Sequence, residues 1–581
     1  MNILLTAINA KYIHSNLAVY SLRACAGEYR DAVELAEYTI NNQKDYILEE
    51  LYKRKPDVLC FSCYIWNIDY VTDIAREYKK LCPSVPIWVG GPEVSYEVEA
   101  FLRENPYIDG VMIGEGEDTF RELCGYYAHK RKLSDIAGIA FRKNSTGNST
   151  SVNNIGGNKA GEIVFTSPRP IKNMSEIPFC YDTLDDFSNR IIYYESSRGC
   201  PFSCSYCLSS VDKTLRFRDT EIVKRELKFF IDQKVPQIKF VDRTFNCNHA
   251  HAMELWRFIK ANDNGVTNFH FEISADLLNQ EELELIFDMR PGLIQLEIGV
   301  QSTNEATIKE IHRTMKLERL KEVVRLIQSG NNIHEHLDLI AGLPYEDYDS
   351  FGRSFDEIYE LKPNQLQLGF LKVLKGSYMF EHAAEYGIVY HDKPPYEVMS
   401  TKWLSFDDVI KIKRVEDMLE VYYNSGQFEI TMKLMECIFD SAFEFFQELG
   451  DFYEANGYFG MSHSRIRRCE ILLEFLALYL HGCDSDAMTS VVLSENAGDR
   501  DNTDFDENAQ IYKMIQESLI FDLYYRENCK SRPVWATDIG SFKHMTHAYC
   551  KNGKLSHVEP FHYISVSYTH LRAHETLSDI V

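Results

Sequence analysis

The chain has 581 residues, a length that predicts roughly three or four domains rather than one. Hydrophobic residues make up 45%, aromatic residues 13% and charged residues 26%, a globular balance that excludes a mostly disordered or fibrous chain. The formal net charge of −25 argues against a general attraction to phosphate backbones or anionic membranes, so a small-molecule substrate is favoured over a nucleic acid or a membrane.

The sequence predicts no membrane-spanning or targeting segment. Its densest apolar stretch, Ile471–Leu480, is short and is interrupted by Glu474. The first residues lack the order of charged, apolar and small residues that marks a signal peptide. The 15 Cys are scattered along domain-like sequence, which is typical of reduced thiols. We therefore predict a cytoplasmic protein.

From Met1 to about Lys130, short apolar runs alternate with amphipathic helical patterns. Buried strands joined by helices indicate a doubly wound parallel sheet, whose ligand site lies at the carboxyl ends of the strands. We assign residues 1–135 to this Rossmann-like domain, with strands predicted at Asn2–Ala7, Val33–Tyr38, Val58–Ser62, Ile87–Gly90 and Gly110–Ile113.

The pattern changes between Gly138 and about Ser188. Strand-like residues at Gly138–Arg142 and Ile163–Ser167 flank the polar stretch KNSTGNSTSVNNIGGNKAGE, which predicts a hairpin with a mobile tip. We assign residues 136–188 to this hairpin and a linker.

A second alternation of strands and helices then covers residues 189–385. Six such units predict a (β/α)6 partial barrel, in which the chemistry belongs to the loops after the strands. The strands are predicted at Ile191–Glu195, Gln237–Val241, Asn268–Ser274, Leu293–Ile298, Ile333–Ile340 and Gln365–Phe370.

The remaining sequence predicts a helical C-terminal domain over residues 386–560, whose role no motif indicates. The stretch Asp484–Asn508 is acidic and polar, and predicts a solvated loop. The tail 561–581 ends in VSYTHLRAHETLSDIV, which resembles a peptide read from sequencing-adaptor DNA. We set this tail apart as non-native when predicting the fold.

Three Cys on one short loop carry the strongest chemical signal. Cys200, Cys204 and Cys207 follow the first strand of the second series at spacings x3 and x2. Three thiolates on one loop reach three corners of an iron–sulfur cubane, which leaves the fourth iron open. Two other interpretations are a zinc site, which needs a fourth ligand that the loop does not offer, and three buried structural thiols.

This pattern resembles the radical S-adenosylmethionine (SAM) superfamily, which has Cys-x3-Cys-x2-Cys after the first strand of a partial barrel. The resemblance continues through Tyr206, through VDRTFN at the end of the second strand, and through FHFEISADLL, LEIGVQSTNEATIKEIHR and HLDLIAGLPYEDYDSF. It implies a [4Fe–4S] cluster on Cys200, Cys204 and Cys207, with SAM on the open iron. Reductive cleavage of SAM would then give a 5′-deoxyadenosyl radical.

The resemblance also implies where SAM binds, although the family's frequent Gly-Gly-Glu run is replaced here by Asp-Arg-Thr. Glu272, Glu297 and Gln301 are candidates for the amino group and the ribose, and Gly342 is a candidate for close approach of the adenine. The expected SAM-binding residues are Tyr206, Asp242, Arg243, Thr244, Glu272, Glu297, Gln301 and Gly342.

The loops of the first domain point to a second cofactor. CFSCYIWN, WVGGPEVS and MIGEGEDTF follow its third, fourth and fifth strands, and their glycines allow a flat ligand to approach the backbone. Followed by a hairpin and the Cys loop, they resemble the cobalamin-binding radical SAM enzymes. The expected cobalamin-binding residues are Ser62, Gly90, Gly91, Pro92, Glu93, Gly114, Glu115 and Gly116.

One element of many cobalamin proteins is absent. The chain has no Asp-x-His-x-x-Gly run to place a His on cobalt, and the context of His14 fits a capping or surface role better. The pair Cys60 and Cys63 lies at a strand end rather than at a helix N-terminus, so we interpret it as packing rather than redox chemistry.

Together these features predict a radical SAM enzyme that methylates an unactivated carbon of a small molecule with the help of cobalamin. The alternatives are a radical cyclisation, rearrangement or oxidation, and a sensor that binds the cofactors without turnover. A nucleic-acid modifier is disfavoured by the net charge of −25. A reducing partner such as flavodoxin or ferredoxin is expected to supply the electron.

Overall fold

The computed structural model describes residues 1–143, 161–481, 503–526, 532–536, 540, 559 and 561–564. They fall into two compact units. Unit 1 comprises residues 1–350 and 361–405, and unit 2 comprises residues 351–360 and the chain from Phe406 onward. Within the described ranges, no helix is long and apolar enough to cross a membrane.

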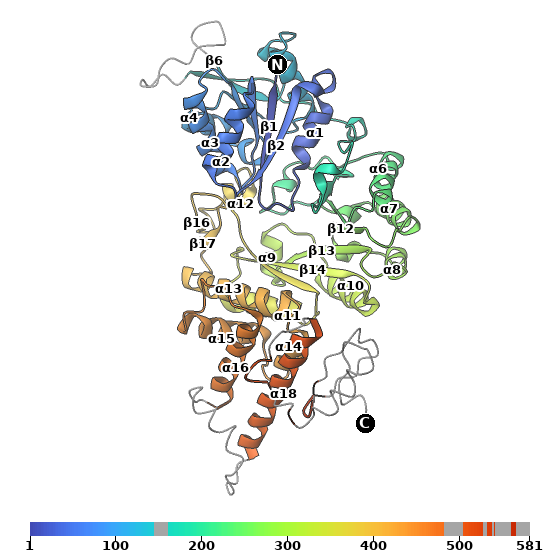
Figure 1. Cartoon of the computed structure of the whole chain (residues 1–581), viewed down its shortest axis with the longest axis vertical. Helices are drawn as coiled ribbons and strands as arrows, with labels where there is room; N and C mark the ends of the chain where they lie inside the picture. Colours follow the sequence, from blue (N-terminus) through green and yellow to red (C-terminus); the bar gives the residue numbers. More distant parts are fainter. Residues whose placement is uncertain are drawn as a thin grey trace. The chain divides into compact units, whose positions relative to one another are not determined.

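Unit 1 begins with a seven-stranded sheet in the order β2-β1-β3-β4-β5-β6-β7. The first five strands are parallel, as predicted. The strands are β1 (Ile3–Asn9), β2 (Val33–Thr39), β3 (Val58–Ser62), β4 (Ile87–Gly90), β5 (Gly110–Met112), β6 (Ile139–Lys143) and β7 (Glu162–Phe165). Their helices are α1 (Leu17–Cys25), α2 (Lys44–Arg54), α3 (Ile68–Leu81), α4 (Val98–Glu104) and α5 (Glu117–Tyr127). Helix α1 covers the opposite face of the sheet from α2, α3 and α4 (Figure 1).

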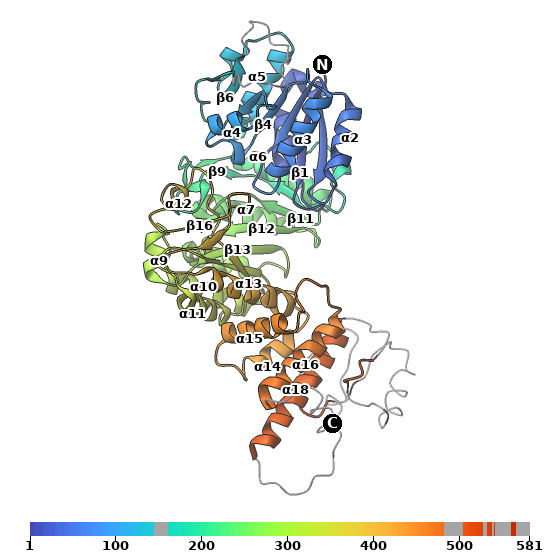
Figure 2. The ribbon, with the colours of Figure 1, turned by 90° about the vertical axis from the view of Figure 1, so that its left-hand side faces the viewer.

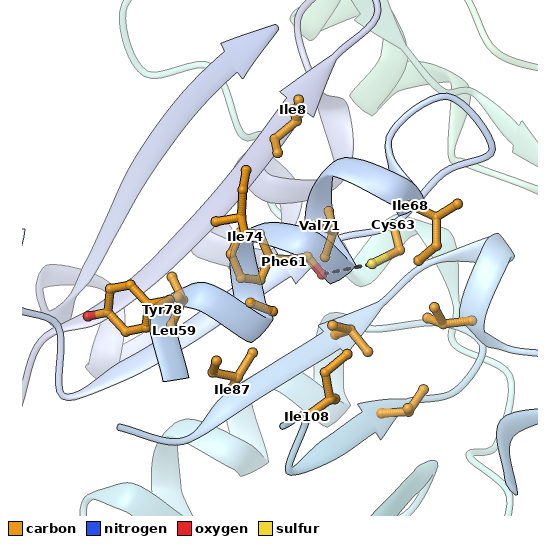
Figure 3. Packing of buried hydrophobic residues seen from close by; sticks show 14 of the residues in the cluster. Ile8, Leu59, Phe61, Cys63, Ile68, Val71, Ile74, Tyr78, Ile87 and Ile108 are labelled. Carbon is orange, nitrogen blue, oxygen red and sulfur yellow. Dashed lines mark hydrogen bonds between the residues drawn. The ribbon is translucent and has the colours of Figure 1, made fainter. Parts of the chain in front are cut away.

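The core of this domain lies between the sheet and α2, α3 and α4. Buried Ile and Val from alternate strands meet the apolar face of α3, and the β3 residues Leu59 and Phe61 are buried beneath it (Figure 3). Cys63 points into the same core, with its sulfur 3.9 Å from the Phe61 carbonyl oxygen. Cys60 is also fully buried, and burial raises the pKa of both thiols. Their packing role is therefore as predicted.

The hairpin β6–β7 corrects one predicted boundary. It does not form a separate linker segment, because β6 pairs antiparallel with β5 and extends the first sheet. The pairing joins Val111 to Ala140, which covers an edge that β5 would otherwise expose. A boundary at residue 135 therefore cuts through a continuous sheet. The predicted mobile tip at 144–160 lies outside the described residues.

The second sheet of unit 1 has six parallel strands in the order β15-β14-β13-β12-β11-β8, which confirms the predicted partial barrel. The strands are β8 (Ile192–Tyr194), β11 (Gln237–Phe240), β12 (Asn268–Ile273), β13 (Ile294–Gln301), β14 (His334–Ala341) and β15 (Gln365–Phe370). Helices α6 (Thr220–Asp232), α7 (His249–Ala261), α8 (Gln280–Phe287) and α10 (Leu317–Gly330) lie along the outside of the strands (Figure 1). The shorter elements are β9 (Ser197–Arg198), β10 (Arg216–Phe217), α9 (Glu305–Glu310) and α12 (Tyr378–Glu381).

The C-terminal boundary of the barrel domain also lies further along the chain than predicted. Strands β16 (Val389–Tyr390) and β17 (Val398–Ser400) pair with each other and belong to unit 1, up to Ser405. Backbone hydrogen bonds from Val398 N to Leu371 O (2.8 Å) and from Val373 N to Tyr396 O (3.0 Å) hold this hairpin on the segment after β15. Residues 386–405 are therefore not part of a helical domain.

Unit 2 is helical (Figure 2). It contains α13 (Phe406–Leu419), a π-helix at Glu420–Asn424, α14 (Glu429–Met435), α15 (Ala442–Ala455), α16 (Arg465–His481) and α18 (Thr503–Arg526). Most of α11 (Tyr348–Tyr359) also belongs to it. Asp356 of α11 accepts hydrogen bonds from Ser441 Oγ (2.7 Å) and Phe443 N (2.8 Å) at the start of α15. Asp356 of α11, a helix that follows barrel strand β14 in the chain, thus caps the N-terminus of α15 in unit 2.

Two predictions for the C-terminal region need correction. The predicted acidic loop ends earlier than Asn508, because α18 begins at Thr503, and acidic residues in a first helical turn favour a helix start as much as a loop. Residues 561–564, which we set apart with the tail, pack on unit 2: Glu517 accepts the N–H groups of His562 (2.7 Å), Tyr563 (2.8 Å) and Ile564 (3.1 Å). Residues 482–502 of the loop and 565–581 of the tail lie outside the described residues.

Candidate functional site

The Cys loop is closed at its base by a short antiparallel ladder. Strand β9 pairs with β10, with Arg198 opposite Arg216, so residues 199–215 form a loop held at both ends. Gly199 has φ of +89°, and a Cβ there would meet the Thr214 carbonyl oxygen at 2.5 Å, so only glycine fits this entry to the loop. The middle of the loop is anchored through Ser205, whose N–H donates to Ile311 O at 2.9 Å.

The three thiols lie close together and are largely shielded from water. Cys200 and Cys204 are buried, and Cys207 is half-buried. Burial raises the pKa of Cys200, and the neighbouring thiols Cys207 and Cys204 raise it further. Their close protein contacts are weak: Cys200 Sγ lies 3.8 Å from Thr244 Oγ1, and Arg313 Nη1 lies 3.8 Å from Cys204 Sγ. The sulfurs are therefore available as ligands.

The donor set fits an iron–sulfur cluster better than a single metal ion. The loop supplies three thiols and no fourth Cys or His ligand. A tetrahedral zinc site needs four ligands, whereas a cubane can take one thiolate at each of three corners and leave the fourth iron open. Arg313 Nη1 lies 3.8 Å from Cys204 Sγ, so a cation stands beside this ligand position. The residues present fit the cluster that the sequence predicts.

The Asp-Arg-Thr run after β11 has three different environments. Asp242 is fully buried and accepts hydrogen bonds from Ser196 N (3.0 Å), Ser196 Oγ (2.7 Å) and Ser197 Oγ (2.5 Å). Burial raises its pKa to about 6. Its carboxylate therefore braces the strand before the Cys loop, so a direct role with SAM has no geometric support. Arg243 is exposed, and Thr244 is buried and donates to Arg243 O at 2.8 Å.

Glu272 and Glu297 line the barrel on neighbouring strands, in register with each other. Burial and the nearby Glu297 raise the pKa of Glu272 to about 7, and its carboxylate makes no hydrogen bond with the described part of the chain. Glu297 lies 2.9 Å from both Lys239 Nζ and His270 Nε2. Burial alone would raise the pKa of Glu297, but His270 and Lys239 outweigh it and lower the pKa to about 2. Glu272 thus has the freer carboxylate for a ligand.

Gln301 has the local geometry of a ligand-binding residue. The register between β13 and β14 shifts between Gly299 and Gln301, and Gln301 has φ of +77°, a conformation that costs free energy for a residue with a side chain. Its Oε1 atom is buried without a hydrogen-bond partner. A Cβ at Gly299 would collide with Gln301 Nε2, so this glycine leaves room for the amide. An orphaned buried acceptor at a bulge fits a ligand donor such as a ribose hydroxyl.

Tyr206 and Gly342 are the other two residues predicted to bind SAM, and both contact other parts of the chain. Tyr206 accepts a hydrogen bond from Arg313 Nη1 at 3.3 Å, beside the Cys loop. Gly342 has φ of +87°, and a Cβ there would lie 2.7 Å from Val398 Cγ1 of β17. The packing of β17 and the backbone conformation already account for this glycine. Its role toward the adenine stays a prediction.

The eight residues predicted for cobalamin gather at the carboxyl-end edge of the first sheet. Ser62 ends β3, Gly90–Glu93 follow β4, and Gly114–Gly116 follow β5. The loops after β4 and β5 are joined, because Gly114 N donates to Ser95 Oγ at 3.3 Å and Ser95 Oγ donates to Gly91 O at 2.9 Å. This edge is the one predicted from the strand order.

The glycines on this edge differ in what surrounds them. Gly91 has φ of +123°, and a Cβ there would collide with the carbonyl oxygen of Cys63. A Cβ at Gly116 would lie 2.9 Å from Leu22, and one at Gly90 would lie 3.4 Å from Met112. Gly114 is exposed, has φ of +76° and has no atom within 4 Å of its Cβ position. Gly114 is thus the glycine with open space for a ligand.

The acidic residues of the same loops already have partners. Tyr396 donates a hydrogen bond to Glu93, and Glu115 forms ion pairs with Arg216 (2.6 Å) and Arg198 (3.6 Å). Burial opposes ionisation of Glu115, but the two guanidiniums lower its pKa overall. Their carboxylates are therefore used within the protein, so a direct contact with cobalamin has no geometric support here.

His14 and an aromatic pair complete this edge. The sequence predicts a capping or surface role for His14. It does not cap α1, because Asn16 is the N-cap, and it is half-buried with its Nδ1 2.7 Å from Tyr193 Oη of the barrel. Tyr64 and Trp66, in the loop after β3, stack with ring centroids 4.4 Å apart and an interplanar angle of 6°. Trp66 is 41% exposed, so the pair presents a flat aromatic surface beside the glycine loops.

Three family models match the chain. B12 binding domain matches residues 3–124, Radical SAM superfamily matches residues 194–358, and Protein of unknown function (DUF4080) matches residues 384–575. The first two occur in tandem: the first covers β1 to β5 of the first sheet, and the second covers β11 to β14 of the second sheet. The chain belongs to the radical SAM proteins that carry a B12-binding domain. This confirms the family and the α/β fold class that we predicted.

The curated relatives include methyltransferases and anaerobic cyclases. The cobalamin-dependent radical SAM methyltransferase TokK of Streptomyces tokunonensis is 26% identical over 365 residues, or 58% of this chain and 49% of the relative. The anaerobic magnesium-protoporphyrin IX monomethyl ester cyclase of Rubrivivax gelatinosus is 22% identical over 58% of this chain and 60% of the relative. The chain spans about half the length of the first curated relatives that it matches.

A solved structure of OxsB, a cobalamin-dependent SAM radical enzyme with aqua-cobalamin bound, shares the fold of this radical SAM protein. The TM-score is 0.58 at 16% identity, and the match covers 95% of this chain and 83% of that chain. At this identity the likeness concerns the fold alone.

Sequence reasoning missed several polar residues of this radical SAM protein that line the barrel or lie beside its Cys loop. Lys239, His270 and His336 alternate with buried apolar residues along β11, β12 and β14, and a period-two pattern within these strands is the signal that could have found them. Arg313 follows a helix and carries no such signal. Only the fold shows that it lies beside Cys204 and Tyr206.

Proposed function

We propose that this chain is a radical SAM enzyme that methylates an unactivated carbon of a small molecule, with a [4Fe–4S] cluster on Cys200, Cys204 and Cys207 and with cobalamin as second cofactor. One juxtaposition supports it: within unit 1, Arg198, two residues before Cys200, forms ion pairs with Glu115 and Glu117 of the first domain. The loop for the cluster thus lies against the glycine loops for cobalamin.

The cofactors would supply the reactivity, and the chain would supply position and shielding. A cluster held by the three thiols would supply the electron for reductive cleavage of SAM, and cobalamin held by the first domain would supply the methyl group. Burial of Cys200 and Cys204 keeps water from the ligand sulfurs. Arg313 lies beside Cys204, and the orphaned Gln301 Oε1 would accept a hydrogen bond from SAM.

The barrel lining supports a polar substrate. Lys239, His270, Glu272, Glu297, His336 and Asp338 all lie on four neighbouring barrel strands, at positions that alternate with buried apolar residues. Lys239 and His270 already pair with Glu297, and His336 pairs with Asp338. An extended apolar molecule would, however, leave the Glu272 carboxyl without a partner, at a cost in free energy. We propose that a reducing partner such as flavodoxin or ferredoxin supplies the electron, and that the enzyme acts in the cytoplasm.

A second candidate function is a radical cyclisation, rearrangement or oxidation without methyl transfer. The similarity to the magnesium-protoporphyrin IX monomethyl ester cyclase favours keeping it. A third candidate function is a sensor that binds the cofactors without turnover, and such a protein should not cleave SAM.

One experiment separates these functions without knowledge of the substrate. The full chain is purified without oxygen, its cluster is reconstituted, and it is incubated with hydroxocobalamin, SAM and titanium(III) citrate. A methyltransferase should form both 5′-deoxyadenosine and S-adenosylhomocysteine. Formation of 5′-deoxyadenosine alone would favour the second function, and formation of neither would contradict the proposal.

A further inference from the structure

The acidic residues of the glycine loops meet the two ends of the Cys loop. Arg198 and Arg216 face each other across the β9–β10 ladder, one before Cys200 and one after the loop. Arg216 Nη2 lies 2.6 Å from Glu115 Oε1, and Arg198 Nη1 lies 3.6 Å from Glu115 Oε2. Arg198 Nη2 also donates to Glu117 Oε1 at 2.5 Å. Two carboxylates of the first domain therefore hold both ends of the loop that carries the thiols.

These ion pairs are better shielded from solvent than ion pairs on the protein surface. The side chain of Arg198 is 17% exposed, that of Arg216 is 13% exposed, and that of Glu117 is 7% exposed. Glu195 shares the Arg198 guanidinium, with its two oxygens 2.8 and 2.9 Å from Nε. Removing one partner of a shielded pair leaves a charge without compensation, which costs far more than breaking an exposed pair. These shielded ion pairs therefore favour a single arrangement of the Cys loop against the loop after β5.

A second contact repeats the arrangement at the loop after β4. Glu93 accepts a hydrogen bond from Tyr396, which precedes β17 on the barrel side of unit 1. Lys375 Nζ lies 5.5 Å from the centre of the Tyr396 ring, so a cation also faces this carboxylate. Each of the two glycine loops thus has an acidic residue that binds the barrel domain.

We propose that Arg198 and Arg216 are positioning residues that fix the Cys loop to the loop after β5 through Glu115 and Glu117, and so set the spacing between the cluster and cobalamin. This inference rests on the proposed function, because the spacing matters only if both cofactors bind. It assigns to Glu115 a role as an anchor between domains in place of the cobalamin contact predicted from the sequence.

The test compares Glu115→Gln with Glu122→Gln in the full chain. Glu122 lies on α5, the helix that follows Glu115, and pairs with Arg169 at 2.5 Å, at similar exposure, but away from the Cys loop. Hydrogen–deuterium exchange is measured in peptides covering 113–118 and 199–215. Loss of the anchor should raise exchange about threefold or more in both regions for Glu115→Gln, and in neither for Glu122→Gln.

The second readout is the paramagnetic coupling between cob(II)alamin and the reduced cluster, in samples loaded with aquacobalamin. Glu115→Gln should keep its iron content and bind cobalamin within about twofold of the original affinity, but show weaker and more heterogeneous coupling. The charge swap Glu115→Arg with Arg216→Glu should restore part of the coupling, which a general loss of stability would not do.

The outcomes distinguish the two proposals. Unchanged exchange and unchanged coupling in Glu115→Gln would overturn the anchor. A cobalamin affinity at least about tenfold weaker with unchanged exchange would show instead that Glu115 contacts cobalamin. If the original protein binds no cobalamin, the proposed function fails, and the exchange measurement alone still decides whether the anchor exists.

Discussion

The two ligand edges of unit 1 use their polar side chains in opposite ways. At the Cys loop, Cys200 Sγ lies 3.8 Å from Thr244 Oγ1 and Cys204 Sγ lies 3.8 Å from Arg313 Nη1, which are weak contacts. Gln301 Oε1, at the end of β13, is buried without a hydrogen-bond partner. At the edge of the first sheet, the carboxylates of Glu93 and Glu115 are bound by barrel residues. Motif residues that look equivalent in the sequence therefore differ in the structure.

This difference indicates how each cofactor would be held. Free thiols and an orphaned amide oxygen suit a cluster and SAM held by side chains. Glycine loops whose acidic side chains are already occupied suit a flat cofactor held by backbone, shape and the exposed Trp66 surface.

The largest effect is expected from Cys204→Ala. The variant should lose the cluster and all formation of 5′-deoxyadenosine, because two thiolates no longer hold the cubane. Iron content, the absorption spectrum and product analysis measure this. Cys247→Ala is the matched control, since this thiol lies near Cys200 but outside the motif, and it should keep the cluster. An intact cluster in Cys204→Ala would contradict the assignment.

Two glycine variants separate packing from binding at the first edge. Gly91→Ala should destabilise the first domain by roughly 2–4 kcal/mol, because its Cβ collides with Cys63 and its φ is +123°. Gly114→Ala should cost only about 1–2 kcal/mol, because its φ is +76° but its Cβ meets open space.

Cobalamin binding is then measured in both folded variants. If the corrin lies over Gly114, Gly114→Ala should weaken cobalamin at a melting temperature close to that of the original protein. Unchanged cobalamin affinity in Gly114→Ala would move the binding surface away from this loop.

Gln301→Ala should weaken SAM about tenfold while the cluster remains, because it removes the acceptor at the bulge. Gly299→Ala should act in the same direction, since its Cβ displaces the Gln301 amide. Equilibrium dialysis with labelled SAM measures both. Gln280→Ala, on the exterior helix α8, serves as control. Equal SAM affinity in Gln301→Ala and the control would contradict a role for this residue in SAM binding.

The smallest effect is expected at Glu335, a buried carboxyl group that lies outside both ligand edges. Glu335 is fully buried with no hydrogen-bonded carboxylate oxygen, and burial raises its pKa to about 8. Because this pKa lies above the value in the unfolded chain, the fold favours the protonated form, and stability is lost as the pH rises from about 5 toward 8.

Glu335→Gln should therefore raise the melting temperature at pH 9, by an amount equivalent to about 1–3 kcal/mol, and change it less at pH 6. Thermal unfolding at the two pH values measures the difference. The exposed Glu281→Gln should show no such dependence. Equal shifts of Glu335→Gln at both pH values would mean that ionisation of this group does not limit stability.

Much of the fold could be predicted from the sequence. Strands β3 and β4 match their predicted bounds, because continuous apolar runs between turn residues specify such strands strongly, and β15 matches through its alternation of polar and apolar residues. The place of β6 could not be predicted, because its pairing with β5 is a contact between distant segments that no local pattern encodes. The same holds for β16 and β17, whose residues 386–405 look like the start of a helical domain.

The candidate site was predictable where spacing determines chemistry. The Cys triplet is defined by its spacing, and the structure brings its three thiols together. Spacing does not show which opposite charges meet, so Glu115 looked like a cobalamin contact until its partners Arg198 and Arg216 were located. In the same way, Asp242 looked like a substitute for a SAM-binding residue, but Ser196 and Ser197 occupy its carboxylate.

The most direct test of the account is electron paramagnetic resonance of the cobalt(II) state, after anaerobic purification, cluster reconstitution and addition of cobalamin. We expect bound cob(II)alamin whose spectrum shows no hyperfine splitting from a nitrogen ligand on cobalt. The chain lacks the His motif, and His14 is hydrogen-bonded to Tyr193. A protein that holds the cluster but binds no cobalamin, or one whose cobalt carries a nitrogen ligand from the chain, would contradict it.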